Sequence, residues 1–160
     1  CGAPTLQVPL LGLARGFARW MNPVGLGDVR AAACRRLLGA VSAHPVLLAG
    51  HGRLCTALLR SAPGRIYPKN GAEGIYNCGF QGRDGRVFGL AVKVSDGAER
   101  GYFPVVAELL RRFGLWDEVP LALAEFAVPL LRNTQKLVVG DVRCALSFDA
   151  VQRRSSPGSS

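Results

Sequence analysis

Apolar residues recur at helical spacing in several stretches of the chain. The clearest stripe places Tyr102, Val106 and Phe113 on one face of residues 99–113, which predicts an amphipathic helix. Asp28 precedes a second stripe and has the side chain of a helix N-cap. Weaker stripes, bounded by Pro and Gly, predict further helices. Together with the helix of the second stripe, the predicted helices cover about residues 9–21, 29–42, 53–61 and 118–131.

Other stretches alternate with the period of a strand. In residues 86–95, Phe88, Leu90 and Val92 share one face, and Lys93 lies on the other. The turn residues 82–85, Gly-Arg-Asp-Gly, come just before and signal a hairpin. Strands joined by a hairpin are antiparallel, so the fold class is α+β, with an antiparallel sheet flanked by helices. The other extended runs are 65–69, 75–80 and 137–146.

Composition supports one folded unit. The chain has 160 residues, of which 49% are hydrophobic and 19% charged, so it is not intrinsically disordered. We expect residues 1–150 to form the domain and the polar residues 151–160 a disordered tail. No run of eighteen apolar residues occurs, so no transmembrane helix is expected.

Charge and cysteine content narrow the class of protein. The formal charge is +9, but the cations are scattered and no nucleic-acid-binding motif accompanies them, which argues against nucleic acid as the partner. The five cysteines are odd in number and contain no C-x-x-C pair, which argues against a disulfide scaffold. Free thiols favour a reducing compartment, and we expect a cytoplasmic location.

The strongest candidate for chemistry is the block Lys69-Asn70-Gly71-Ala72-Glu73-Gly74 between two extended runs. A lysine in a partly buried site can lose its proton or hold its charge against an anion. The alternative is a turn with a solvated lysine, in which Glu73 is only a turn residue. For Lys93 we favour an edge-strand position that deters aggregation. No G-x-S-x-G, S-x-x-K, P-loop or H-E-x-x-H motif is present.

Three blocks together carry a resemblance to a known family. They are Gly52-Arg53-Leu54-Cys55-Thr56, the Lys69 block, and Leu90-Ala91-Val92-Lys93-Val94-Ser95-Asp96-Gly97 followed by Arg100. Asn133, the run Val139-Gly140-Asp141-Val142-Arg143 and the opening Cys1-Gly2-Ala3-Pro4 extend it over about residues 1–146. The chain resembles the type II L-asparaginases of the Rhizobium etli kind.

The resemblance implies a fold similar to serine β-lactamases and glutaminases, and hydrolysis of L-asparagine to L-aspartate and ammonia. Lys69 would be the lysine of a second Ser–Lys pair, with Gly71 and Glu73 in the pocket. Cys55 matches a cysteine beside the site, and Cys1 matches a ligand of a zinc ion. The family's N-terminal half, with its S-x-x-K pair, second serine and Cys-x-x-Lys segment, has no counterpart in the sequence.

Two functions follow from these observations. The first is a C-terminal part of an L-asparaginase that lacks the nucleophilic serine and is inactive alone. Its partners would be L-asparagine and the missing N-terminal half, with a homodimer left open. The second is a non-catalytic remnant or binding module for a partner chain or an acidic macromolecule, which an exposed apolar patch would favour.

Overall fold

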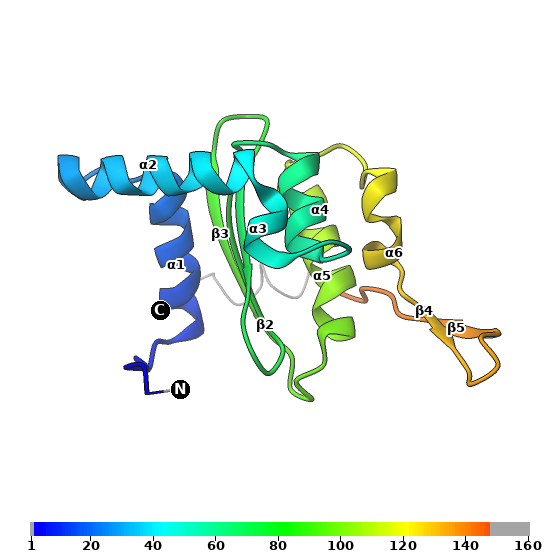
Figure 1. The fold of residues 1–160 in the computed structure, drawn as a ribbon. Coiled ribbons are helices and arrows are strands. Elements are labelled where there is room, and N and C mark those ends of the chain that lie inside the picture. Colours follow the sequence, from blue (N-terminus) through cyan, green and yellow to red (C-terminus); the bar gives the residue numbers. More distant parts are fainter. Residues whose placement is uncertain (1, 148–160) are drawn as a thin grey trace, which may run out of the picture.

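The computed structural model describes residues 2–147 and contains two small antiparallel sheets with helices around the larger one (Figure 1). The larger sheet has the order β1-β2-β3, and the smaller pairs β4 with β5. This confirms the α+β class. In chain order the elements are α1 (Leu10–Met21), α2 (Asp28–Ala43), α3 (Pro45–Ala49), α4 (Leu54–Ser61), β1 (Ile66–Asn70), β2 (Ile75–Gln81), β3 (Val87–Lys93), α5 (Glu99–Arg112), the 3-10 helix η1 (Leu121–Leu123), α6 (Ala124–Ala127), β4 (Leu130–Arg132) and β5 (Val138–Asp141).

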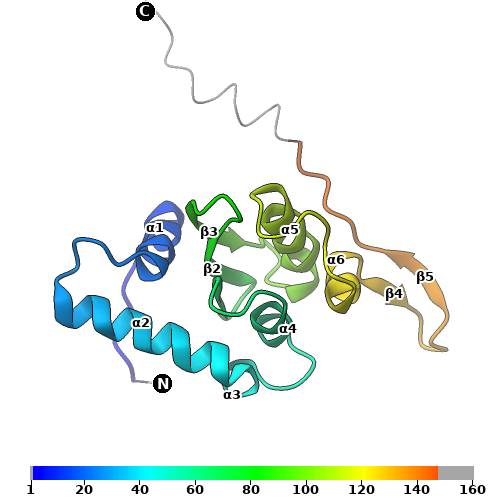
Figure 2. The same cartoon turned by 90° about the horizontal axis from the view of Figure 1, so that it is seen from above.

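The two faces of the larger sheet are covered by different helices. Tyr76, Cys78 and Phe80 alternate along β2 and are buried in the core with α4 and α5. Helix α1 crosses the opposite face (Figure 2). A Cβ on Gly89 would overlap the backbone carbonyl oxygen of Ala14, so glycine permits the close approach of α1.

The register of the sheet decides which side chains of β1 face the core. Asn70 pairs with Tyr76, and Lys69 pairs with Asn77. Directly opposed residues of antiparallel strands point to the same face, so Asn70 lies on the α4 face with Tyr76. The Cβ of Lys69 lies on the α1 face, at the end of the strand.

Two predicted elements are wrong near the C-terminal end. Residues 118–131 form no single helix, because the chain makes only the 3-10 helix η1 and one turn of α6 before it extends again at Pro129. A proline there cannot continue the hydrogen-bond ladder of a helix. The predicted strand 137–146 is reduced to Val138–Asp141, whose partner is β4.

Smaller differences concern the N-terminal helices. The N-cap of α2 is Gly27, and Asp28 is already the first helical residue, where its carboxylate still meets the positive end of the helix dipole. The short helix α3 follows α2 immediately and was not predicted. Lys93 ends β3, an edge strand of the sheet, as its sequence context predicts. The predicted tail, residues 151–160, lies outside the described residues.

Candidate functional site

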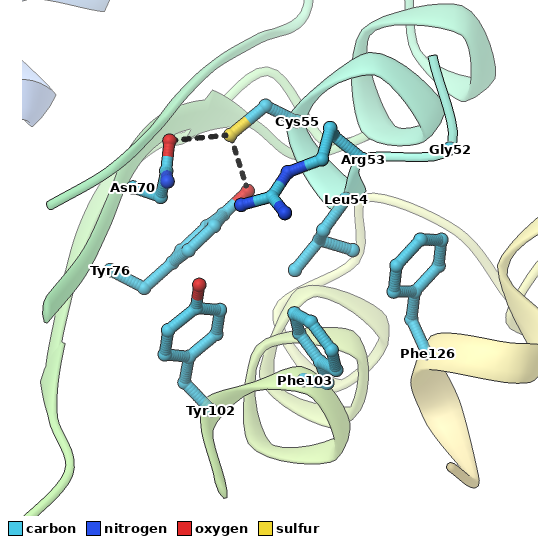
Figure 3. Close-up of a pocket in the computed structure, with 9 residues that line it drawn as sticks. All are labelled: Gly52, Arg53, Leu54, Cys55, Asn70, Tyr76, Tyr102, Phe103 and Phe126. Carbon is cyan, nitrogen blue, oxygen red and sulfur yellow. Dashed lines mark hydrogen bonds between the residues drawn. The ribbon is translucent and has the colours of Figure 1, made fainter. Parts of the chain in front are cut away.

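The candidate site lies where the end of β1 meets the start of α4. Cys55 is the second residue of α4 and only 2% exposed. Its Sγ lies 3.2 Å from the hydroxyl oxygen of Tyr76. It also lies 3.9 Å from Oδ1 of Asn70, to which the thiol donates. The thiol therefore contacts polar groups of β1 and β2 that the register brings to this face of the sheet (Figure 3).

Burial decides the protonation state of these groups. Desolvation raises the pKa of the Cys55 thiol, although a side-chain hydrogen bond with Tyr76, a backbone hydrogen bond with Asn70 and the charges of Lys69 and Arg53 act in the opposite direction. Desolvation also raises the pKa of Tyr76 well above its ordinary value. Both groups are therefore neutral near pH 7. A neutral thiol is a poor nucleophile, so Cys55 has the chemistry of a pocket residue.

Lys69 reaches the same amide from the other side. Its side chain is exposed, and its Nζ donates to the backbone oxygen of Asn70 at 2.8 Å and to Asn70 Oδ1 at 3.3 Å. Asn70 Oδ1 thus accepts from both Cys55 and Lys69. The structure brings these two predicted site residues together through a residue that lies between them.

A small cavity of about 30 Å³ opens beside Cys55, which is room for about one or two water molecules. Its polar wall is Cys55, Asn70 and Tyr76, and α5 contributes Tyr102, whose ring centroid lies 4.9 Å from that of Tyr76. Arg53 lines it too and donates to Glu99 at 2.8 Å. Its other lining residues are Gly52, Leu54, Phe103 and Phe126 (Figure 3).

The arrangement suits a neutral polar group such as a carboxamide. Tyr76 and Cys55 are uncharged donors or acceptors, and Asn70 offers an amide. Arg53 lines the cavity, and a guanidinium group there can stabilise a carboxylate or a developing oxyanion. A water-sized cavity cannot enclose a whole amino acid, so only the end of such a ligand fits there as the side chains now lie.

Gly71 and Glu73 lie on the exposed turn after β1 and do not line this cavity. Glu73 has a φ of 56°, which is the left-handed region. Lys93 Nζ donates to the backbone oxygen of Glu73 and fastens the turn to β3. The Gly71 amide donates to the Ile75 carbonyl at 2.8 Å. Their assignment to the substrate pocket stays a prediction.

The predicted zinc ligand, Cys1, lies outside the described residues. Within residues 2–147, no group of three or more His, Cys, Asp or Glu side chains is placed to hold a metal ion. Zinc in proteins takes about four ligands of this kind. The described residues do not fit a zinc centre on their own.

The sequence patterns did not single out several lining residues. Examples are Asn70, Tyr76 and Arg53, which lie in or next to predicted elements. Whether each of them reaches the cavity depends on the face of the strand or helix that it occupies. Strand alternation through residues 75–80 could have placed Tyr76 on the core face. Tyr102 was assigned only to the apolar stripe of α5, which hides its hydroxyl group.

Two comparisons with known proteins bear on this site. A family model described as L-asparaginase II matches residues 1–144. That range includes Cys55, Asn70, Lys69 and Tyr76. A search of curated proteins returned no match.

Within the described residues, no helix is both long and apolar enough to cross a bilayer.

Proposed function

Because the chain belongs to the L-asparaginase II family, we propose that it carries part of the active site of an enzyme that hydrolyses L-asparagine to L-aspartate and ammonia. The observation that supports this most directly is the meeting of Lys69 and Cys55 at Asn70 Oδ1. Family membership supports an asparaginase-type amidohydrolase in general, and the substrate and the residue roles are the finer proposal.

Lys69 is the proposed proton-transfer group. A serine outside the described residues attacks the side-chain amide carbon of asparagine and passes its proton through Lys69 to the departing nitrogen, which leaves as ammonia. Water then cleaves the acyl-enzyme ester and releases aspartate. Lys69 is exposed at the end of a strand, where a second segment of protein can approach it.

Asn70 and Cys55 are proposed positioning residues. The Asn70 amide oxygen accepts from Lys69 Nζ and so fixes the position of the Lys69 side chain. Cys55 anchors the same oxygen from inside the core. Arg53 pairs with Glu99, and its remaining N–H groups are proposed to hydrogen-bond the carboxylate of the substrate.

No serine lines the cavity among the described residues. Ser61 donates to the Leu58 carbonyl and Ser42 accepts from the Gly64 amide, which are structural roles. The other two described serines, Ser95 and Ser147, are exposed and do not line the cavity. We therefore propose that the nucleophile comes from an N-terminal part of the enzyme. The 160-residue chain assayed alone should release no ammonia from L-asparagine, and measurable turnover by it would overturn this assignment.

The role of Lys69 is tested in the protein that includes the N-terminal part. Lys69→Ala should lower kcat by about a hundredfold or more, while the melting temperature stays the same because the side chain is exposed. Lys69→Arg keeps the positive charge and should still lose the proton-transfer step. Lys136→Ala, on the exposed hairpin between β4 and β5, is the matched control. A near-normal rate for Lys69→Ala would refute the role.

A second candidate function is favoured by a separate observation. Leu121 is 90% exposed, and Leu137 and Val139 are exposed on the β4–β5 hairpin. Apolar surface of this kind suits a contact with another chain, either the N-terminal part or a second copy. Sedimentation velocity distinguishes the cases, because a homodimer doubles the mass of the chain on its own.

A further inference from the structure

A second hollow, larger than the cavity beside Cys55, lies between α4 and the segment that carries η1 and α6. Its volume is about 410 Å³, within the range of about 300–1,000 Å³ that is typical of small-molecule sites. η1 contacts α4, and α6 packs against α5 next to it (Figure 1). Ala57 and Arg60 of α4 form one wall of this α4–α6 hollow, and Glu125 and Phe126 of α6 belong to the other.

Two opposite charges line the α4–α6 hollow without a partner in the chain. The side chains of Arg60 and Glu125 are both exposed. Within residues 2–147, neither of them forms an ion pair or a side-chain hydrogen bond, with each other or with any other residue. A guanidinium group and a carboxylate on opposite walls are therefore available to a ligand between them.

The other polar side chains of the α4–α6 hollow already donate within the chain. The hydroxyl groups of Thr56 and Ser61 donate to backbone carbonyls at 2.6 Å and 2.9 Å. Arg53 lines the hollow too, but its guanidinium group pairs with Glu99 at 2.8 Å. The polar groups left for recognition are thus one cation and one anion, which match a ligand that carries both charges itself.

The remaining lining is apolar, and its aromatic member is held in place. Phe126 packs edge-on against Phe103 of α5, with 5.2 Å between the ring centroids. Ala57 and Pro120 are apolar surfaces of the same hollow. A ring that is fixed before a ligand arrives loses little conformational freedom on binding. An aliphatic group of the ligand would be removed from water against these side chains.

We propose that the α4–α6 hollow binds a free α-amino acid with an aliphatic side chain, such as leucine. Its carboxylate accepts hydrogen bonds from the Arg60 guanidinium group, its ammonium group donates to the Glu125 carboxylate, and its side chain packs on Phe126. A simple anion fits less well, because Glu125 repels it. Phe126 also lines the cavity beside Cys55, so the two sites are neighbours.

The test uses the whole 160-residue chain, labelled with ¹⁵N and titrated with L-leucine. The backbone amide NMR signals of Ala57, Arg60 and Phe126 should shift saturably, with a Kd of about 1 mM or below. The signals of Asn70 and Tyr76, at the candidate active site, should shift less. This binding does not rest on the proposed function, since the chain alone is expected to be inactive.

Two analogues that each lack one charge of leucine test the recognition. 4-Methylpentanoate has no ammonium group and 3-methylbutylamine has no carboxylate, and each should bind about tenfold more weakly than leucine. Arg60→Gln should weaken leucine binding about tenfold and leave 3-methylbutylamine within about twofold. Glu125→Gln should weaken leucine equally but not 4-methylpentanoate. A variant that only disturbed the fold would weaken all three ligands.

Arg36→Gln is the matched control, because Arg36 is exposed on α2 and does not line the α4–α6 hollow. It should leave leucine binding within about twofold. No saturable shift at about 10 mM leucine, or 4-methylpentanoate binding as tightly as leucine, would overturn the proposal. Shifts centred on Asn70 and Tyr76 would overturn it as well, because the amino acid would then occupy the proposed active site, and the proposed function would stand.

Discussion

The middle of the chain and its two flanks differ in how they use apolar residues. Every buried residue among the described ones lies between Leu54 and Leu123. Residues 2–53 and 124–147 include no buried side chain, although they contain four complete helices and a hairpin. In the flanks Val29 is 85% exposed and Leu47 84%, whereas Leu58 and Leu110 are fully buried.

This difference indicates which part of the chain stabilises the fold and which part offers surface for binding another chain. The middle buries its apolar side chains between the sheet, α4 and α5 and supplies every fully buried residue of the core, against which partly buried flank residues such as Leu48 and Phe126 pack. The flanks carry apolar side chains that this chain does not cover, which is typical of surfaces that bind another chain. The candidate site lies at the boundary, since Cys55 belongs to the core while Arg53 and Phe126 come from the two flanks.

The largest expected effect is in the core. Leu58→Ala should lower the free energy of unfolding by about 3 kcal/mol, because it removes a fully buried side chain and leaves a cavity. Leu47→Ala in α3 should change it by less than about 0.5 kcal/mol. Urea titration of both variants measures this, and equal losses would contradict the contrast between middle and flanks.

The second-largest expected effect concerns the packing of α1 against the sheet. Gly89→Ala should cost about 2 kcal/mol, because the new Cβ overlaps the Ala14 carbonyl and pushes α1 off the sheet. Hydrogen exchange should quicken across Leu10–Met21 and stay slow in α5. Gly16→Ala is the matched control, since nothing lies near its added Cβ. Loss of protection in both helices would mean that flank and core unfold together.

Cysteine reactivity sharpens the contrast at the site. Cys55 and Cys78 are buried in the middle, whereas Cys34 and Cys144 are partly exposed in the flanks. Burial raises the pKa of Cys55 and of Cys78, so iodoacetamide at pH 8 should alkylate them about tenfold more slowly or worse. Peptide mapping by mass spectrometry gives the four rates. Labelling of Cys55 as fast as Cys34 would show that the cavity opens readily.

The smallest effect concerns ion pairs. A hydrogen bond from Arg111, with support from Arg112, lowers the pKa of Glu108 to about 2. The folded pKa lies below the unfolded value of 4.5, so this stabilisation is complete above pH 4.5 and is lost as the pH falls through about 2. Because both arginines are more than a third exposed, we expect Glu108→Gln to cost only about 1 kcal/mol at pH 7.

The exposed pair of Asp141 and Arg143 in the C-terminal flank is the comparison for Glu108. Asp141→Asn should cost less than Glu108→Gln, because water screens a pair on an open strand end. Thermal melts of both variants at pH 7 and at pH 3 show which substitution lowers the melting temperature more. A larger loss of stability for Asp141→Asn than for Glu108→Gln would contradict this ranking, because the pair in the hairpin would then stabilise the fold more than the pairs of Glu108.

Local patterns predicted the long elements well. The stripe through Tyr102 and Phe113 predicted α5 over 99–113, and the helix covers Glu99–Arg112. The alternation around Leu90 predicted β3. The helix expected over 118–131 failed because its apolar spacing is weak and Pro129 ends it early. For elements of one turn, contacts with the rest of the fold outweigh intrinsic preference.

The candidate site was predicted in part. The residue types of the Lys69 block and of the Cys55 block were recognisable in the sequence. Their meeting at Asn70 depends on the pairing of Asn70 with Tyr76 and on the packing of α4 against β1. A shift of one residue in that register would turn Asn70 to the opposite face. Sequence spacing alone therefore could not rank Asn70 above Gly71 or Glu73.

The sequence by itself determined the α+β class, the positions of the long helices and of the central hairpin, and the resemblance to asparaginases. These depend on periodicity and on short motifs, which are properties of neighbouring residues. Only the tertiary structure decided that Cys55, Asn70 and Lys69 converge and that burial keeps the Cys55 thiol protonated. Each of those depends on strand register and helix packing, which bring together residues far apart in the chain.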